Sequence, residues 1–399
     1  MRRFWFANDD LPIVILSRLS AKTLHYLKYV SKRWFNLISD RSFIASQLKK
    51  TEPVSGFFFQ EIFEWTDQEG IEPISYIPVD NQTVTVTRTV LDFLPDNVVI
   101  LSLNNGLLCC RSCFPNSQPK IYVCNPLTKK FTSLHWPNCD ITQHSSISLA
   151  FDPFQNPVDT STHFKLVAVS VVKNEIVDED EDGIENNYEE YVFSFDIFSS
   201  ETGSWRRSNE QCISNYNLTK NKKNAMVNEV SYWLTDGFQI LMFDPRYDLS
   251  LLVTAPLPPT EFSSIPEMCI GESEGKLHYV IVSEDGLQLW ALQDHFGSTW
   301  ELRMAIALDV LERENPKMPL YTLSEKVSLR VYKEMPAWID PLSFKDGVLL
   351  LRVSANVYMY RFETREMKKL CHVSTLGPKS MCSPIVLPYS MSLVPLDGA

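Results

Sequence analysis

The chain has 399 residues, of which 44% are hydrophobic, 12% aromatic and 22% charged, and its net charge is −12. This composition is typical of a folded globular protein and excludes a disordered chain. No apolar run reaches the length of a signal peptide or of a membrane span, so we expect neither secretion nor a membrane partner. The nine cysteines are odd in number and irregularly spaced. This usage predicts reduced thiols and a location in the cytoplasm, the nucleus or both.

The charge is divided unevenly along the chain. Residues 1–50 hold ten Lys and Arg and three Asp and Glu, a balance of +7, whereas the remaining 349 residues balance at −19. A basic N-terminal segment suits an acidic protein partner. Extended contact with nucleic acid requires clustered Lys and Arg, so the acidic remainder predicts that no nucleic acid is bound.

The first predicted elements are short helices within residues 9–50. Apolar residues recur there at steps of three and four, a spacing that makes one apolar face of a helix. They are Leu24, Leu27, Val30, Trp34, Leu37 and Ile38. Proline is tolerated only in the first turn of a helix. We therefore expect a shortened first helix that starts near Pro12, with Asp9 or Asp10 near its N-cap.

From about residue 54 onward, short runs rich in valine, isoleucine and aromatic residues alternate with turn residues, which predicts strands. The main expected strands span residues 57–59, 83–90, 98–103, 121–124, 164–172, 191–198, 240–243, 277–282, 287–292, 327–332, 348–353 and 357–362. A weak repeat of about 45 to 70 residues indicates a β-propeller of about six blades over residues 54–399. A generic β-sandwich, or several small β domains, is the alternative.

A further apolar run lies at the other end of the chain, over residues 385–387 and 389–394. We expect it to pair with an early strand near Phe57 and so close the ring. Closure removes exposed strand edges and thereby limits aggregation.

Two groups of motifs resemble those of plant F-box proteins. The first resembles the F-box, the short helical motif that docks on the Skp adaptor of SCF-type ubiquitin ligases. It comprises Ile15-Leu16-Ser17-Arg18-Leu19, Ala21-Lys22-Thr23-Leu24, Val30-Ser31-Lys32-Arg33-Trp34 and Leu37-Ile38-Ser39-Asp40. The second resembles the kelch-like F-box-associated domain, through Asn105-Gly106-Leu107-Leu108-Cys109, Cys124-Asn125-Pro126-Leu127-Thr128 and Phe151-Asp152-Pro153. An F-box over residues 9–50 and an F-box-associated β-propeller-like domain over 54–399 are the expected domains.

The resemblance implies a non-catalytic substrate receptor, which docks an acidic Skp adaptor, reaches cullin through it and holds an unknown target protein on the β domain. The residues expected to contact the adaptor, or to support that surface, are Leu16, Leu19, Leu24, Val30, Trp34, Leu37 and Ile38. Of these, Trp34 and Leu37 are expected to pack inside the helical head. The alternative is a stand-alone β-propeller interaction protein, because the family pattern is four residues short just before Ile15. A propeller enzyme with a site in its channel is a third hypothesis, although no catalytic motif is present.

One group of residues has the composition of a zinc site. Cys110-x-x-Cys113 lies near further candidate ligands, which are Cys109, Cys124, His135 and Cys139. A structural zinc site usually uses two such close pairs, and a second pair is missing. Cysteines buried in the core are therefore the preferred interpretation, and no metal or other cofactor is expected.

An acidic segment has the composition of a calcium site. Asp178, Asp180 and Asp182, with Gly183 and Glu189, satisfy the EF-hand loop formula. An EF-hand needs a helix on each side, whereas the flanking runs are of strand type. A solvated acidic hairpin loop is preferred over a calcium loop.

Overall fold

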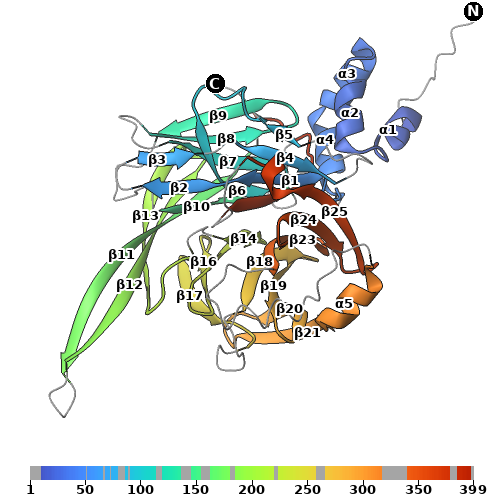
Figure 1. Cartoon of the computed structure of the whole chain (residues 1–399). Helices are drawn as coiled ribbons and strands as arrows, with labels where there is room; N and C mark the ends of the chain where they lie inside the picture. Colours follow the sequence, from blue (N-terminus) through green and yellow to red (C-terminus); the bar gives the residue numbers. More distant parts are fainter. Residues whose placement is uncertain are drawn as a thin grey trace, which may run out of the picture.

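A computed structural model gives a small helical head on a large body of antiparallel sheets (Figure 1). It describes residues 10–50, 52–65, 68–71, 73–79, 86–88, 90–113, 119–135, 145–153, 162–179, 185–219, 223–257, 266–316, 339–377 and 384–396. The expected strand at 327–332 lies outside these ranges, and so does most of the expected strand at 83–90.

The head contains four short helices, as the sequence predicts. They are α1 (Asp10–Leu16), α2 (Ala21–Leu27), α3 (Lys32–Ser39) and α4 (Arg41–Leu48). Helix α1 has only seven residues and begins at Asp10, two residues before the expected start at Pro12. Pro12 still lies in the first turn, where its missing N–H leaves no hydrogen bond unmade.

Side chains at the N-caps fix where the later helices begin. The Ser20 hydroxyl accepts from the Thr23 backbone N–H at 3.3 Å, and Ser31 caps α3 in the same way. The Asp40 carboxylate accepts from the Phe43 N–H at 3.2 Å at the start of α4. The hydrogen bonds that Asp40 accepts from the Ser42 hydroxyl and from the Phe43 N–H lower its pKa. All three caps satisfy N–H groups that have no partner within the helix.

In its described residues, the body consists of strands, with one helix and one 3-10 turn among them. The bounds are β1 Gly56–Gln60, β2 Ile62–Trp65, β3 Gln68–Ile71, β4 Ser75–Pro78, β5 Thr87–Arg88, β6 Val98–Asn104, β7 Leu107–Ser112, β8 Lys120–Asn125, β9 Lys130–His135, β10 Ser146–Ala150, β11 Lys165–Glu179, β12 Glu185–Ser199, β13 Ser204–Ser214, β14 Asn224–Val227, β15 Val230–Leu234, β16 Gln239–Asp244, β17 Leu249–Thr254, β18 Glu267–Ser273, β19 Lys276–Ser283, β20 Gly286–Asp294, β21 Thr299–Ile306, α5 Leu308–Glu314, β22 Ile339–Lys345, β23 Val348–Val353, β24 Asn356–Arg361, β25 Glu366–His372, η2 Val373–Thr375 and β26 Ile385–Tyr389.

Four separate four-stranded sheets contain sixteen of the 26 strands described. Three of them are built from consecutive strands, β6 to β9, β10 to β13 and β14 to β17, as expected for propeller blades. The fourth has the order β26-β1-β4-β5, and the pair β2–β3 stands apart. The mainly β, propeller-type fold predicted from the sequence is confirmed.

The blade count differs from the expected six. Strands β18 to β25 form one eight-stranded sheet, so the separate four-stranded sheets number four. Two antiparallel halves, β18–β21 and β22–β25, are joined by the parallel pairs Gly271↔Phe344 and Glu272↔Lys345. A Cβ at position 271 would lie 1.9 Å from the Phe344 carbonyl oxygen, so glycine permits this close approach.

The two ends of the body pair with each other, as predicted. Strand β26 lies antiparallel to β1, in a register that runs from Gly56↔Tyr389 to Gln60↔Ile385. The ring of Phe58 lies 5.1 Å from that of Tyr389. Residues from opposite ends of the chain therefore complete one sheet.

The motifs of the second resemblance converge on the chain that follows β26. Asn125 is fully buried, and its Nδ2 donates to the carbonyls of Ser392 at 3.0 Å and Val394 at 2.9 Å. A Cβ at Gly106 would lie 2.1 Å from the Ser392 Cβ. Thr162 donates to the Pro395 carbonyl at 2.6 Å. We call these contacts with residues 392–395 the C-terminal clamp.

Replacing Asn125 by alanine is expected to lower the free energy of unfolding by about 2 kcal/mol, because two buried carbonyls lose their donor. Thr162→Val removes a single clamp hydrogen bond, so its expected loss is about 1 kcal/mol. Urea unfolding of both variants measures the difference. An Asn125→Ala protein as stable as the wild type would contradict the clamp.

The head and the body share a hydrophobic core. One cluster of buried side chains contains Leu16, Leu24 and Ile38 from the helices together with Phe58 and Leu108 from the sheets. The Gln47 side chain donates to the Leu19 carbonyl at 2.9 Å within the head. The helical segment is therefore seated on the body.

Candidate functional site

The head exposes an unusual share of the apolar side chains. Among the described residues, thirteen large apolar side chains are exposed, and seven of them lie within residues 13–35. We call these seven the head surface: Ile13, Val14, Ile15, Tyr26, Tyr29, Val30 and Phe35. So many exposed apolar groups on so short a segment indicate a surface for a protein partner.

The helices hold this surface outward because their other faces are used inside. Leu16, Leu24 and Ile38 are buried in the shared core. Tyr29 and Val30 follow α2, in the turn before α3, and are 78% and 66% exposed. A partner can therefore cover the head surface without unfolding the helices.

The predicted adaptor-contacting residues occupy three different environments. Leu16, Leu24 and Ile38 are buried. Leu19, Trp34 and Leu37 are half-buried and pack against the core cluster, and Val30 is exposed. Leu16, Leu24 and Ile38 thus occupy the inside of the head. Trp34 and Leu37, which were expected to pack there, lie half-buried against the same cluster.

Six of the seven exposed residues are absent from the set that the sequence predicts. The apolar stripe of period three to four predicts a binding face, but most of its side chains pack inward. The sequence does contain an indication of the exposed residues, namely the aromatic residues Tyr26, Tyr29 and Phe35, which lie outside the apolar stripe. Apolar residues that a short amphipathic helix does not need for its own core are candidates for contact.

The head surface is basic as well as apolar. The His25 ring lies 5.7 Å from that of Tyr29, and burial and the charge of Lys28 lower the pKa of His25. Burial also lowers the pKa of Lys28. Lys22 and Lys32 are exposed on the same helices. An acidic partner would complement this charge.

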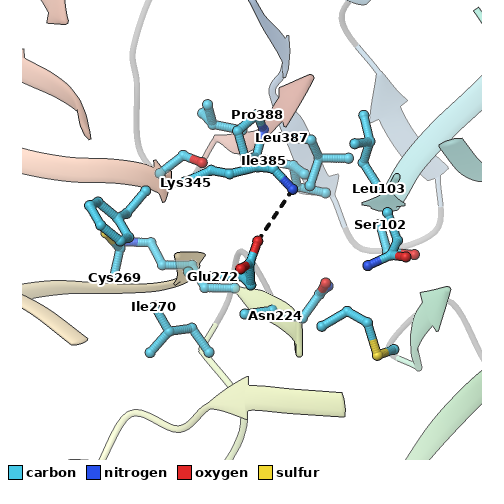
Figure 2. Close-up of a pocket in the computed structure, with 18 of the residues that line it drawn as sticks. Ser102, Leu103, Asn224, Cys269, Ile270, Glu272, Lys345, Ile385, Leu387 and Pro388 are labelled. Atoms are coloured by element: carbon cyan, nitrogen blue, oxygen red, sulfur yellow. Dashed lines mark ion pairs between the residues drawn. The ribbon is translucent and has the colours of Figure 1, made fainter. Parts of the chain in front are cut away.

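A second candidate site is a cavity at the centre of the body. Its volume is about 60 Å³, and its lining comes from one edge strand of each four-stranded sheet and from the two middle strands of the eight-stranded sheet. These strands are β6, β10, β14, β18, β22 and β26. Figure 2 shows the ion pair that crosses it, in which Lys345 Nζ lies 3.5 Å from Glu272 Oε2.

This cavity is too small for a substrate. Ligand pockets typically measure at least about 300 Å³, whereas 60 Å³ holds a few water molecules. Its two lysines, Lys223 and Lys345, are both engaged by acidic or carbonyl oxygens. Within the described ranges, no group of three or more His, Cys, Asp and Glu is arranged to hold a metal.

The candidate zinc ligands lie apart or in the core. Cys109, Cys110 and Cys124 are buried, and burial raises the pKa of the Cys109 thiol far above its ordinary value. Zinc binds the thiolate, which such burial disfavours. Cys113 donates to the Asn97 carbonyl at 3.0 Å, and Cys139 lies outside the described residues.

The candidate calcium ligands are not brought together by the described backbone. Asp178 pairs with Asn186 in the β11–β12 register, whereas Glu189 pairs with Glu175, three positions closer to the body. The Glu189 carboxylate is held by Lys173 Nζ at 2.7 Å. Asp180 and Asp182 lie outside the described residues.

Comparison with known proteins identifies the family. The chain matches the model of the family described as "F-box protein At3g26010-like, beta-propeller" over residues 76–323, more than half of its length. The chain belongs to this family of F-box β-propeller proteins. The propeller-type ring and its cavity therefore agree with the family to which the sequence motifs pointed.

Similar proteins of Arabidopsis thaliana carry F-box names. The F-box protein At5g07610 is 27% identical over 391 residues, covering 92% of this chain and 86% of its own. The F-box protein At5g49610 is 27% identical and covers 82% of this chain and 86% of its own. The F-box/kelch-repeat protein At3g61590 is 26% identical and covers 49% of this chain and 44% of its own. None of the described helices has the length and apolar character needed to cross a membrane.

Proposed function

We propose that this chain is the substrate-recognition subunit of an SCF-type ubiquitin ligase. One observation carries the proposal: among the described residues, seven of the thirteen exposed large apolar side chains lie in the helical segment that resembles an F-box. The head surface would contact a Skp-type adaptor, and the adaptor would link the chain to cullin. Tyr26 and Tyr29 are exposed, and tyrosine is one of the residue types enriched at the energetically dominant positions of protein interfaces.

The charge of the head supports an acidic adaptor as its partner. Residues 1–50 carry +7, and Skp adaptors are acidic, as the F-box resemblance implies. Opposite charges around an apolar contact speed association and orient the two proteins. Lys22, Lys28 and Lys32 are the basic groups nearest the exposed tyrosines in the sequence.

The proposed role needs no catalytic group in this chain. Holding a target on the body while the head is bound to the ligase raises the effective concentration of the target near the ubiquitin-charged enzyme. The body would supply the target-binding surface. The head and the body share a core, so the two surfaces are held in a fixed relation.

The test is co-purification of the full chain with a Skp-type adaptor. The double variant Tyr29→Asp plus Val30→Asp should weaken adaptor binding at least about thirtyfold, because two exposed apolar contacts become charged. The matched control is Tyr247→Asp plus Leu302→Asp, which makes the same change at two exposed apolar residues of the body. This control should bind like the wild type.

The same experiment distinguishes the alternative function. Helix α1 has only seven residues, which favours a degenerate F-box that recruits no ligase. A wild-type chain that is folded but does not retain the adaptor would overturn the receptor proposal. The protein would then be a stand-alone β-propeller interaction protein.

A further inference from the structure

The hairpin formed by β11 and β12 extends far beyond the other strands of its sheet (Figure 1). The two strands pair from Lys165↔Ser199 to Glu179↔Glu185. We call residues 170–179 and 185–192 the arm. Strand β13 stops at its pair with Tyr191, so the six outermost pairs of the arm have no neighbouring strand among the described residues. At about 3.4 Å per residue, this two-stranded part is roughly 20 Å long.

One edge of the arm is open for pairing. Strand β10 accompanies β11 only from Lys165 to Val169. In the described part of the chain, no strand pairs with the outer edge of β11 from Ser170 to Glu179. An edge of this kind presents backbone N–H and C=O groups and is a template for an added strand.

An apolar row crosses the base of the arm. Val172 pairs with Val192, and Val192 pairs with Ile213 of β13, so the three β-branched side chains lie side by side on one face. Val172 and Ile213 are 54% and 56% exposed. A strand added along β11 would place one of its residues next to Val172 and extend this row.

The arm concentrates the negative charge of the chain. Its residues, 170–179 and 185–192, contain six Asp and Glu and one Lys, a balance of −5 within a total of −12. Glu175 lies directly opposite Glu189, and like charges in this position destabilise a strand pair. Lys173 offsets part of this repulsion, at 2.7 Å from Glu189 and 3.5 Å from Glu175. A further positive charge from outside would offset more of it.

The arm and the head leave the body on opposite faces. Strands β1 and β11 are both second in their sheets, next to the first strands β26 and β10. The head precedes the beginning of β1, whereas the arm is formed by the end of β11. Strands in the same position of a propeller run in the same direction, so these two points lie on opposite sides of the ring. A ligand on the arm is therefore clear of the head surface.

We propose that the arm binds an extended basic segment of a partner protein, which adds as a strand to the free edge of β11. The charge selects a basic segment, and the apolar row requires an apolar residue beside Val172. In the added strand, the residues on either side of this apolar residue point to the opposite face of the sheet, which is the face that carries Glu175 and Glu189. The preferred segment therefore alternates apolar residues with Lys or Arg. This binding goes beyond the proposed ligase role and does not depend on it.

The test measures binding of synthetic peptides to the purified full chain by fluorescence anisotropy. The probe is a labelled peptide of about ten residues in which Val and Lys alternate, matching the length of the free edge. A second peptide has the same composition, with its Val and Lys residues in separate blocks. We expect the alternating peptide to bind at least about tenfold more tightly, because only it satisfies both faces.

Two variants test the placement on β11. Val172→Lys adds a like charge beside the open edge, and Glu175→Lys reverses a charge on the other face. Each should weaken binding of the alternating peptide roughly five- to tenfold. Leu302→Lys is the matched control, since it places the same charge on an exposed strand residue of β21. Equal affinity for both peptides, unaltered binding to the Val172→Lys chain, or no binding at all would overturn the proposal.

Discussion

A chain that ends at residue 383 is expected to accumulate as insoluble protein. The truncation removes β26, which pairs with β1 over five residue pairs, and the segment that the C-terminal clamp holds. Strand β1 would then present an unpaired edge of mostly aromatic residues, Phe57 to Phe59. Exposed edges of this kind promote aggregation.

The size of the effect follows from burial. Seven buried apolar side chains would be lost, namely Ile385, Val386, Leu387, Tyr389, Leu393, Val394 and Leu396. Each contributes about 1.5 to 3 kcal/mol on burial, which sums to roughly 10 kcal/mol or more. The whole stability of a folded domain is about 5 to 15 kcal/mol, so the loss is comparable with the total.

Solubility after expression, followed by thermal unfolding of any soluble fraction, measures this prediction. A chain lacking only residues 397–399 is the control and should behave like the wild type. A soluble chain ending at residue 383 with an unchanged melting temperature would show that the ring does not depend on β26.

Much of the fold was predictable because the central strands are runs of β-branched and aromatic residues. The pairing of the chain ends also followed from apolar runs at 57–59 and 385–387. The joined sheet was not predictable, because it depends on a backbone approach at Gly271 that leaves no pattern in the sequence. In the sequence, nothing distinguishes Gly271 from any other glycine within a strand.

The arm was underestimated for a related reason. The sequence predicts strands at 164–172 and 191–198. In the structure, β11 continues to Glu179 and β12 already begins at Glu185. Acidic residues have low strand propensity, so the sequence predicts a loop for their part of the hairpin. The two strands begin to pair in the buried part of their sheet and keep the same register, without a shift, out to Glu179↔Glu185.

The candidate site was predictable as a region and not as a set of residues. The F-box motifs located the head, but the apolar period does not tell an inward face from a contact face. Leu24 and Tyr29 lie five residues apart, and one is buried while the other is 78% exposed. Burial depends on where the body seats the helices, and this is a property of the tertiary structure.

Replacing Asp340 by asparagine is expected to lower the free energy of unfolding by about 3 kcal/mol. The Asp340 carboxylate is only 14% exposed and lies 3.8 Å from Lys223 Nζ and 3.6 Å from the Arg352 guanidinium. Lys223 also donates to the carbonyls of Met268 at 2.8 Å and Pro341 at 3.3 Å, which ties it to β18 and β22. Without the carboxylate, two largely buried cations lose their shared counter-charge, and breaking a buried pair in this way is strongly destabilising.

Urea unfolding of matched variants separates burial from charge. Asp309→Asn removes the same charge from an exposed ion pair with Arg313, so its expected cost is below about 1 kcal/mol. Lys223→Met added to Asp340→Asn should recover part of the loss, because it removes one of the two cations that lost their ion pair with Asp340. Equal losses for Asp340→Asn and Asp309→Asn would mean that solvent screens Asp340 as fully as a surface carboxylate. The ion pairs of Asp340 with Lys223 and Arg352 would then add nothing to the stability of the ring.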